Sequence, residues 1–325
     1  MDNDTTGLAA YDDEIDLREL FSVLWEGKLT IALVTALSAV ISVSVALNLP
    51  NKYTSEALLA PRAEGGAGGT LGQLASQYGG LASLAGINIG GLGEGGKTAI
   101  AIEILKSREF FGEYLYDHVL VDLMAAEGWD RVSNESTLDP SIFDRVTNTW
   151  VREVGPEFQV KPSIQEAHDE FIERFFSVSE DKTTGFVTVK ITHYSPSVAR
   201  DWVLLIVNGV NNAVRARDVE EAENSIAFLN EQRQKTSLVS LTEVFAELIE
   251  QQTKTVMLAA ASEEYVFQVI DPPVAPELKS EPSRALICIL GVLLGGMLAV
   301  VYVLISHYAK GDGRRLSPDG LGEAV

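Results

Sequence analysis

Two long segments without a charged side chain constrain the structure of this chain more than any other feature. The first, residues 29–51, is 23 residues long and has a lysine on each side. The second covers residues 285–306. Because about 20 apolar residues in a helix cross the hydrocarbon core of a bilayer, both segments predict transmembrane helices. Two such spans place both termini on the same side of the membrane.

The flanking segments indicate the orientation of these spans. The stretch before the first span is long and acidic, whereas a cleaved signal peptide begins with a short basic region, so we expect the first span to be retained. Lys310, Arg314 and Arg315 follow the second span closely, which favours a cytoplasmic position for both termini. This predicts cytoplasmic tails at residues 1–28 and 307–325 and a periplasmic domain at residues 52–284.

Small residues recur at helical spacing in both spans. The second span has Gly291 and Gly295 four residues apart, with Gly296 beside them, and the first has Ala32 and Ala36. Glycines one turn apart allow two helix backbones to approach closely in lipid. We expect these residues to pack helix against helix, within one subunit or between subunits. The alternative is the ordinary frequency of glycine in membrane helices.

Composition excludes several functional classes. The formal net charge of -21 argues against nucleic acid as a ligand, because phosphate binding requires clustered cations. The single cysteine, Cys288, lies in an apolar run and is expected to behave as a small hydrophobic residue. The four histidines are scattered, and no acid–base pair stands out among the many carboxylates. We therefore expect no cofactor, no metal site and no catalytic residue.

The region between the spans has signals for both strands and helices. Thirteen glycines between residues 65 and 96 are too many for a regular element and predict a loop. Turn residues at 180–185 join two β-branched runs into a hairpin. The expected strands are residues 53–61, 175–178, 186–192 and 265–271.

A very long helix is predicted for residues 197–261, because no glycine or proline occurs between Gly209 and Pro272. At 1.5 Å per residue it would extend roughly 100 Å, so it must pack on neighbouring helices or subunits. Together these signals predict an α+β fold, with a mixed α/β base near the membrane and an extended helix. A stiff, extended connector leads into the second span, with prolines at Pro272, Pro273, Pro276 and Pro282.

Residues 91–98 match the phosphate-loop pattern G-x-x-x-x-G-K-[ST], ending in Lys97 and Thr98. Such a loop needs an apolar strand directly before it and a downstream strand that ends in Asp. Neither is present, and a chance match is unsurprising in a glycine-rich segment. We interpret this match as unrelated to nucleotide binding.

Several sequence blocks occur in a characteristic order along the chain. They are residues 13–20, 24–28, 80–86, 97–101, 105–110, 188–196, 248–254, 257–259, 265–276 and 282–285. In these blocks the chain resembles the chain-length determinant (Wzz-type) proteins, the polysaccharide co-polymerases of Gram-negative inner membranes. The resemblance spans nearly the whole chain, and the order and placement of the blocks make it specific. The glycine-rich stretch and the acidic N-terminal tail depart from the family pattern.

This resemblance implies a periplasmic α+β base, a long helix that leads away from the membrane and a ring-like homo-oligomer, expected to be an octamer. It also implies a non-enzymatic role in setting the chain length of a polysaccharide, which would be O-antigen or a related polymer. The implied partners are a membrane polymerase, the nascent lipid-linked polysaccharide and membrane lipids.

An alternative is a membrane activator or adaptor subunit that pairs with a separate tyrosine kinase in capsule or exopolysaccharide export. A fused kinase is not expected, because only residues 310–325 follow the second span and they hold no tyrosine cluster. A two-span receptor is also disfavoured, because it would need a sizeable cytoplasmic signalling region after the second span, and we find none in these residues.

Overall fold

The structure of the protein is a computed structural model that describes residues 17–62, 94–236 and 238–312. It divides into two compact units. One unit is formed by the two ends of the chain, up to residue 49 and from residue 282, and is called the terminal-helix unit here. The other, residues 50–281, is called the central domain. The predicted glycine-rich loop lies almost entirely outside the described residues.

Three helices make up the described part of the terminal-helix unit: α1 (Leu17–Glu26), α2 (Lys28–Asn48) and α10 (Arg284–Asp312). The helices α2 and α10 are long and apolar enough to cross a membrane, with mean hydropathies of 2.3 and 2.7. The helix α2 ends before the predicted span does. Leu49 is extended, with ψ of 131°, because the following Pro50 disfavours helical backbone in the residue before it.

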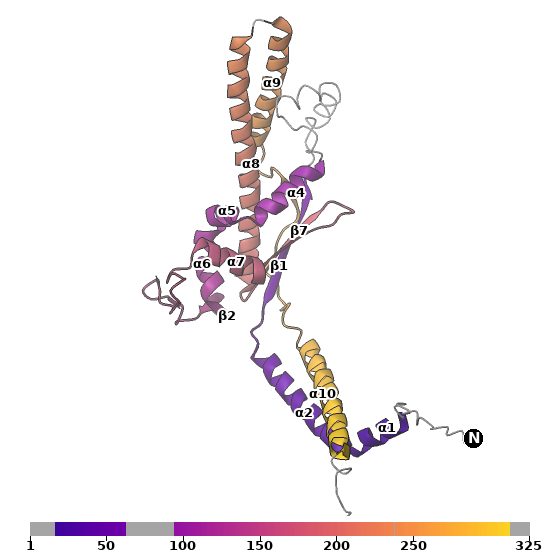
Figure 1. Cartoon of the computed structure of the whole chain (residues 1–325). Coiled ribbons are helices and arrows are strands. Elements are labelled where there is room, and N and C mark those ends of the chain that lie inside the picture. Colours follow the sequence, from indigo (N-terminus) through magenta and orange to yellow (C-terminus); the bar gives the residue numbers. More distant parts are fainter. Residues whose placement is uncertain (1–16, 63–93, 237, 313–325) are drawn as a thin grey trace, which may run out of the picture. The chain divides into compact units, whose positions relative to one another are not determined.

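A four-stranded antiparallel sheet forms the base of the central domain (Figure 1). Its strand order is β6-β7-β1-β8, so the first strand after α2 lies between two strands from much later in the sequence. The four predicted strands are all present, with small differences at their ends. The strands are β1 (Tyr53–Pro61), β6 (Phe176–Glu180), β7 (Val187–His193) and β8 (Phe267–Asp271).

The hydrophobic core lies between this sheet and the first half of α8 (Pro196–Lys235). Every second residue of β7 is buried, as is expected for a strand with one covered face. The opposing face of α8 contributes Trp202, Val203 and Ile206, all buried. An antiparallel sheet with helices on one side is an α+β arrangement, so the predicted fold class is confirmed.

Shorter elements surround this core. Gly209 of α8 lets the ring of Phe110 approach, since a Cβ atom there would lie 3.1 Å from its Cζ atom. The helices are α4 (Glu94–Leu105), α5 (Arg108–Phe110), the π-helical turn η2 (Phe111–Leu115), α6 (Tyr116–Ala125) and α7 (Ile164–Arg174). Two small hairpins pair β2 (Ala126–Asp130) with β3 (Glu135–Leu138) and β4 (Phe143–Asp144) with β5 (Thr149–Trp150).

The single long helix predicted for residues 197–261 is wrong. The chain forms α8, which ends at Lys235, and α9 (Val239–Ala261), and the two lie side by side as a helical hairpin (Figure 1). Thr236 and Leu238 are both extended, and the Leu238 N–H reaches Thr236 Oγ1 at 3.5 Å. Hydroxyl side chains near a helix end can offer backbone groups such alternative partners.

Folding back also gives one face of α9 a partner within the same chain. Leu241, Phe245, Leu248, Gln252 and Thr255 recur at spacings of three and four residues; Leu241 is 41% exposed and the other four are half-buried. Half-burial of this face is what an amphipathic helix gains by packing on its neighbour. The predicted dependence on other subunits is therefore met, at least in part, by α8.

Candidate functional site

The helices α2 and α10 pack closely through small residues. A Cβ atom on Gly291 would lie 2.4 Å from the Cβ of Ser42, and one on Gly295 would lie 2.3 Å from the Cβ of Ser38. Any larger side chain at either glycine would force the helices apart. The Ser38 hydroxyl also donates a hydrogen bond of 2.6 Å to the Gly291 carbonyl. Small residues and interhelical hydrogen bonds are the features that stabilise helix pairs in lipid.

The other small residues singled out from the sequence lie differently. Gly296 faces Thr35 at an ordinary contact distance of 3.7 Å. Ala32 and Ala36 are exposed and do not form the face of α2 that meets the two glycines. Sequence reasoning missed the serines at positions 38 and 42, which have the same four-residue spacing and were a readable signal. A contact of Ala32 and Ala36 with another subunit stays a prediction.

The first and last residues of the central domain lie side by side. The Lys52 N–H donates to the Glu281 carbonyl at 2.9 Å, and the Ser280 N–H donates to the Lys52 carbonyl at 2.9 Å. Thr54 Oγ1 lies 2.7 Å from Ser280 Oγ. These bonds hold the strand that follows α2 to the segment that precedes α10, so both connections to the terminal helices leave the central domain at one place.

The proline-rich connector follows β8 and lies along the start of β1. The Ser55 hydroxyl donates to the Val274 carbonyl at 2.8 Å and fixes the middle of this segment. Pro273 is buried, Pro276 and Pro282 are half-buried and Pro272 is exposed. Proline restricts the unfolded chain as well as the folded one, which suits an extended segment that is bridged to the residue before β1 only near its end, at Glu281. The structural role of the four prolines stays a prediction.

The phosphate-loop residues that are described take part in contacts within the protein. Lys97 and Thr98 lie in the first turns of α4, and Lys97 Nζ is 3.3 Å from Asp218 Oδ2 of α8. The Tyr265 hydroxyl donates to the same oxygen at 2.8 Å. Within the described ranges, no group of three or more His, Cys, Asp or Glu side chains could hold a metal ion.

Asn211 of α8 is a buried residue that the sequence did not single out. Its Oδ1 accepts hydrogen bonds from the backbone N–H groups of Tyr265, Val266 and Phe267, at 2.9–3.0 Å. Its Nδ2 donates to the Phe267 carbonyl at 3.1 Å. These bonds fix the chain where it leaves α9, and they explain why β8 begins two residues later than predicted. An asparagine on an amphipathic helix gives no sequence signal for this role.

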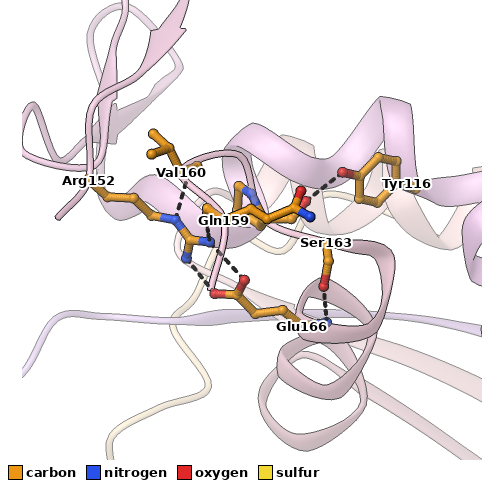
Figure 2. A network of polar contacts seen from close by, with 7 residues as sticks. Tyr116, Arg152, Gln159, Val160, Ser163 and Glu166 are labelled. Atoms are coloured by element: carbon orange, nitrogen blue, oxygen red, sulfur yellow. Dashed lines mark hydrogen bonds and ion pairs between the residues drawn. The ribbon is translucent and has the colours of Figure 1, made fainter. Parts of the chain in front are cut away.

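A second polar network holds the long loop before α7 (Figure 2). The Arg152 guanidinium makes a two-pronged ion pair with the Glu166 carboxylate, and both side chains are largely buried. Arg152 also donates to the carbonyls of Val160, at 2.9 Å, and Gln159, at 2.7 Å. The Ser163 hydroxyl caps α7 by accepting from the Glu166 N–H at 3.2 Å. The three guanidinium nitrogens of Arg152 each have a protein partner, which is typical of a structural site.

His193, at the end of β7, is fully buried between the sheet and Trp202. Its Nδ1 accepts from the Ser195 N–H at 3.0 Å, so Nε2 carries the proton and faces the Asp122 carbonyl at 3.3 Å. Burial away from water disfavours the charged imidazolium and lowers the pKa of His193 below its ordinary 6.5. The neutral ring is thus a structural hydrogen-bonding group.

Two family models match the chain. The chain length determinant protein (Wzz) model matches residues 13–118. The chain contains a Wzz-type chain-length determinant domain. The model described as "G-rich domain on putative tyrosine kinase" (GNVR) matches residues 230–308. The Wzz domain covers α2 and β1, and the GNVR domain covers α9, β8 and most of α10. In the α2–α10 contact, α2 belongs to the Wzz match and most of α10 to the GNVR match. At the joined ends of the central domain, Lys52 likewise belongs to the Wzz match and residues 280–281 to the GNVR match.

Solved structures with some similarity include a full-length bacterial polysaccharide co-polymerase. It is 14% identical, the match covers 94% of this chain and 100% of that one, and the TM-score is 0.37. A fragment of WzzB, a polysaccharide co-polymerase from Salmonella Typhimurium, is 12% identical over 71% of this chain and 100% of that one, with a TM-score of 0.27. No curated protein sequence matches significantly. At these scores the structural similarity carries no argument, and the Wzz assignment depends on the family model.

Proposed function

We propose that this Wzz-domain protein sets the length of a lipid-linked surface polysaccharide, such as O-antigen, and does not itself form glycosidic bonds. The observation that carries the proposal is the Wzz domain over residues 13–118, which supports a polysaccharide chain-length regulator. The buried polar groups described above are satisfied within the protein, which agrees with a structural role for them. A separate membrane polymerase would supply the chemistry.

The proposed setting is a bacterial inner membrane, crossed by α2 and α10. Two apolar helices near the ends of the chain and the Wzz domain support it. In this arrangement the tails are cytoplasmic and the central domain is periplasmic. Reporter fusions at residue 150 and at the C-terminus test the orientation. Periplasmic reporter activity at residue 150 supports it, and cytoplasmic activity there overturns it.

Assembly into a ring-like homo-oligomer, expected to have eight subunits, is part of the proposal. Large apolar side chains on the helical hairpin support it, since Phe228, Val239 and Met257 are 60%, 74% and 67% exposed. Packing these side chains against another subunit would remove their apolar surface from water. Mass measurement of the purified protein in detergent should give a multimer, and Phe228→Glu with Met257→Glu should reduce its size.

The functional experiment compares the polysaccharide of a gene deletion with that of the parent strain. We expect the length distribution on a gel to change while polymer is still made. Restoring the gene should restore the original distribution. Complete loss of polymer in the deletion would contradict a regulatory role and indicate an essential synthesis or export component.

The GNVR match favours a second candidate, a membrane adaptor for a separate tyrosine kinase. In that case the protein would act by binding a cytoplasmic kinase, and its deletion would lower tyrosine phosphorylation of that kinase. Purification of the tagged protein from membranes, followed by phosphotyrosine detection, separates the two candidates. A co-purifying tyrosine kinase supports the adaptor, and its absence together with altered polymer length supports the regulator.

A further inference from the structure

An open pocket of about 570 Å³ lies on the central domain, close in sequence to both membrane helices. It is lined by Tyr53 at the start of β1, by Trp129 and Arg131 of the β2–β3 hairpin, and by Arg200 in the first turns of α8. Residues 275–277 of the proline-rich connector complete the lining. Two aromatic and two guanidinium side chains thus share one pocket.

Contacts within the protein hold the aromatic part of this pocket in place. The rings of Tyr53 and Trp129 meet edge to face, with their centroids 5.4 Å apart. The Trp129 indole N–H donates to Asn134 Oδ1 at 3.1 Å, and the Ser197 hydroxyl approaches the same oxygen at 3.4 Å. Asn134 has a φ of 56°, a conformation that asparagine tolerates better than most residues. The hairpin is therefore fixed to α8 through one amide, and Trp129 is preorganised.

The charge of the pocket differs in sign from that of the whole protein. The lining has two arginines and one carboxylate, Glu277, although the chain has a net charge of -21. Arg200 makes an ion pair with its neighbour Asp201, but both side chains are exposed, at 43% and 56%. Exposed pairs of this kind are weak and readily exchanged. Arg200 donates to Asp201 Oδ1 through Nε at 2.9 Å and Nη2 at 2.6 Å, so an anion in the pocket would compete with this exposed carboxylate for the guanidinium.

We propose that this pocket binds a phosphorylated sugar, with Arg131 and Arg200 on the phosphate and Trp129 and Tyr53 against the sugar ring. Guanidinium groups bind phosphate oxygens through paired, charge-assisted hydrogen bonds. An aromatic face carries partial negative charge and covers the C–H groups of a sugar ring. Binding of a phosphorylated sugar is inferred from the lining residues of the pocket. Only the biological role of that binding rests on the proposed function.

The test titrates full-length protein in nanodiscs of phosphatidylcholine with glucose 1-phosphate, glucose and inorganic phosphate, using ligand-observed NMR. Glucose 1-phosphate should bind most tightly, because it alone has both a phosphate for the two arginines and a sugar ring for the aromatic side chains. Arg131→Gln with Arg200→Gln should weaken its binding at least about tenfold. Trp129→Ala should abolish its preference over inorganic phosphate.

Arg145→Gln is the matched control, since Arg145 is an exposed arginine outside the pocket that pairs with Glu135. It should leave binding unchanged, and the arginine variants should keep the thermal unfolding midpoint of the parent protein. Equal binding of the three probes, or equal loss in the control and the pocket variants, overturns the proposal.

A second arm identifies the source of the sugar phosphate. Nanodiscs that also contain a polyprenyl phosphoglucose should displace bound glucose 1-phosphate if the ligand is a membrane-anchored head group. Unchanged binding assigns the pocket to a soluble or glycan-borne sugar phosphate. A deletion strain with normal polymer length would refute the proposed function and leave this binding result intact. Normal binding by the pocket variants would refute the proposed binding site and leave the proposed function unaffected.

Discussion

At the scale of single residues, the buried amide of Asn211 joins α8 to the chain that follows α9. Asn211→Leu should lower the free energy of unfolding by about 2–4 kcal/mol, because the buried backbone groups of residues 265–267 lose their partner. Urea denaturation followed by circular dichroism measures this change. Asn208→Leu, at an exposed position of the same helix, should cost less than about 1 kcal/mol. Equal losses in the two variants would contradict this role of Asn211.

His193 makes the stability of the central domain depend on pH. Its pKa is below 6.5 in the folded protein because it is buried, and is about 6.5 in the unfolded chain. The unfolded state therefore binds the proton first as the pH falls. The stability contribution is fully present above pH 6.5 and declines below it, by up to about 1.4 kcal/mol per pH unit. Denaturation curves between pH 7.5 and 5 should show this decline.

The matched comparison for His193 uses the exposed His118. His193→Gln should flatten the pH dependence, although it lowers stability at pH 7.5. His118→Gln should leave the slope unchanged. If the slope persists in the His193 variant, another group causes it.

At the scale of elements, the Arg152–Glu166 pair attaches the long loop to α7. Arg152→Ala should destabilise the domain by about 3 kcal/mol, since it leaves a largely buried carboxylate and two carbonyls without their donor. Arg152→Lys should recover only part of this, because an ammonium group cannot make the two-pronged contact. The more exposed pair of Arg174 and Glu170, at 51% and 27%, is the control, and Arg174→Ala should cost about 0.5 kcal/mol or less. The thermal unfolding midpoints of the three variants measure these losses of stability.

The α2–α10 contact can be tested through a designed disulfide. Thr35→Cys with Gly296→Cys, in the Cys288→Ser background, should cross-link within one chain, because a Cβ atom on Gly296 would lie 3.7 Å from Thr35 Oγ1, the atom that the cysteine sulfur would replace. Adding Gly295→Leu should sharply reduce the cross-link, since the new side chain would overlap Ser38. The exposed Met297→Leu should not. A cross-link that forms only between chains would contradict the contact.

At the scale of the whole molecule, the core of the central domain is complete without the terminal helices. A fragment of residues 50–281 should therefore be soluble and unfold in one cooperative transition. A shorter fragment, residues 50–263, lacks β8 and the backbone groups that Asn211 binds. It should be largely unfolded, as measured by near-ultraviolet circular dichroism. A stable short fragment would show that β8 is dispensable.

Local pattern alone was sufficient for much of this fold. The two apolar helices, the strand that follows the first of them and the β6–β7 hairpin were all predicted from residue spacing. Each depends on neighbours in sequence, through side-chain periodicity, turn residues or the length needed to cross a bilayer. The resemblance to the Wzz-type proteins likewise came from the order of sequence blocks, and the family model matches residues 13–118.

Tertiary structure decided the features that depend on residues far apart in the sequence. The break at Thr236 is favoured because α9 gains a packing partner by folding back, which no local signal reports. The choice of Ser38 and Ser42 over Ala32 and Ala36 depends on which face of α2 meets α10. The pocket draws on four separate segments, and Asn211 is recognisable only with the chain it binds in view. In each case the free energy lies in contacts between distant segments, and a single sequence does not specify which segments meet.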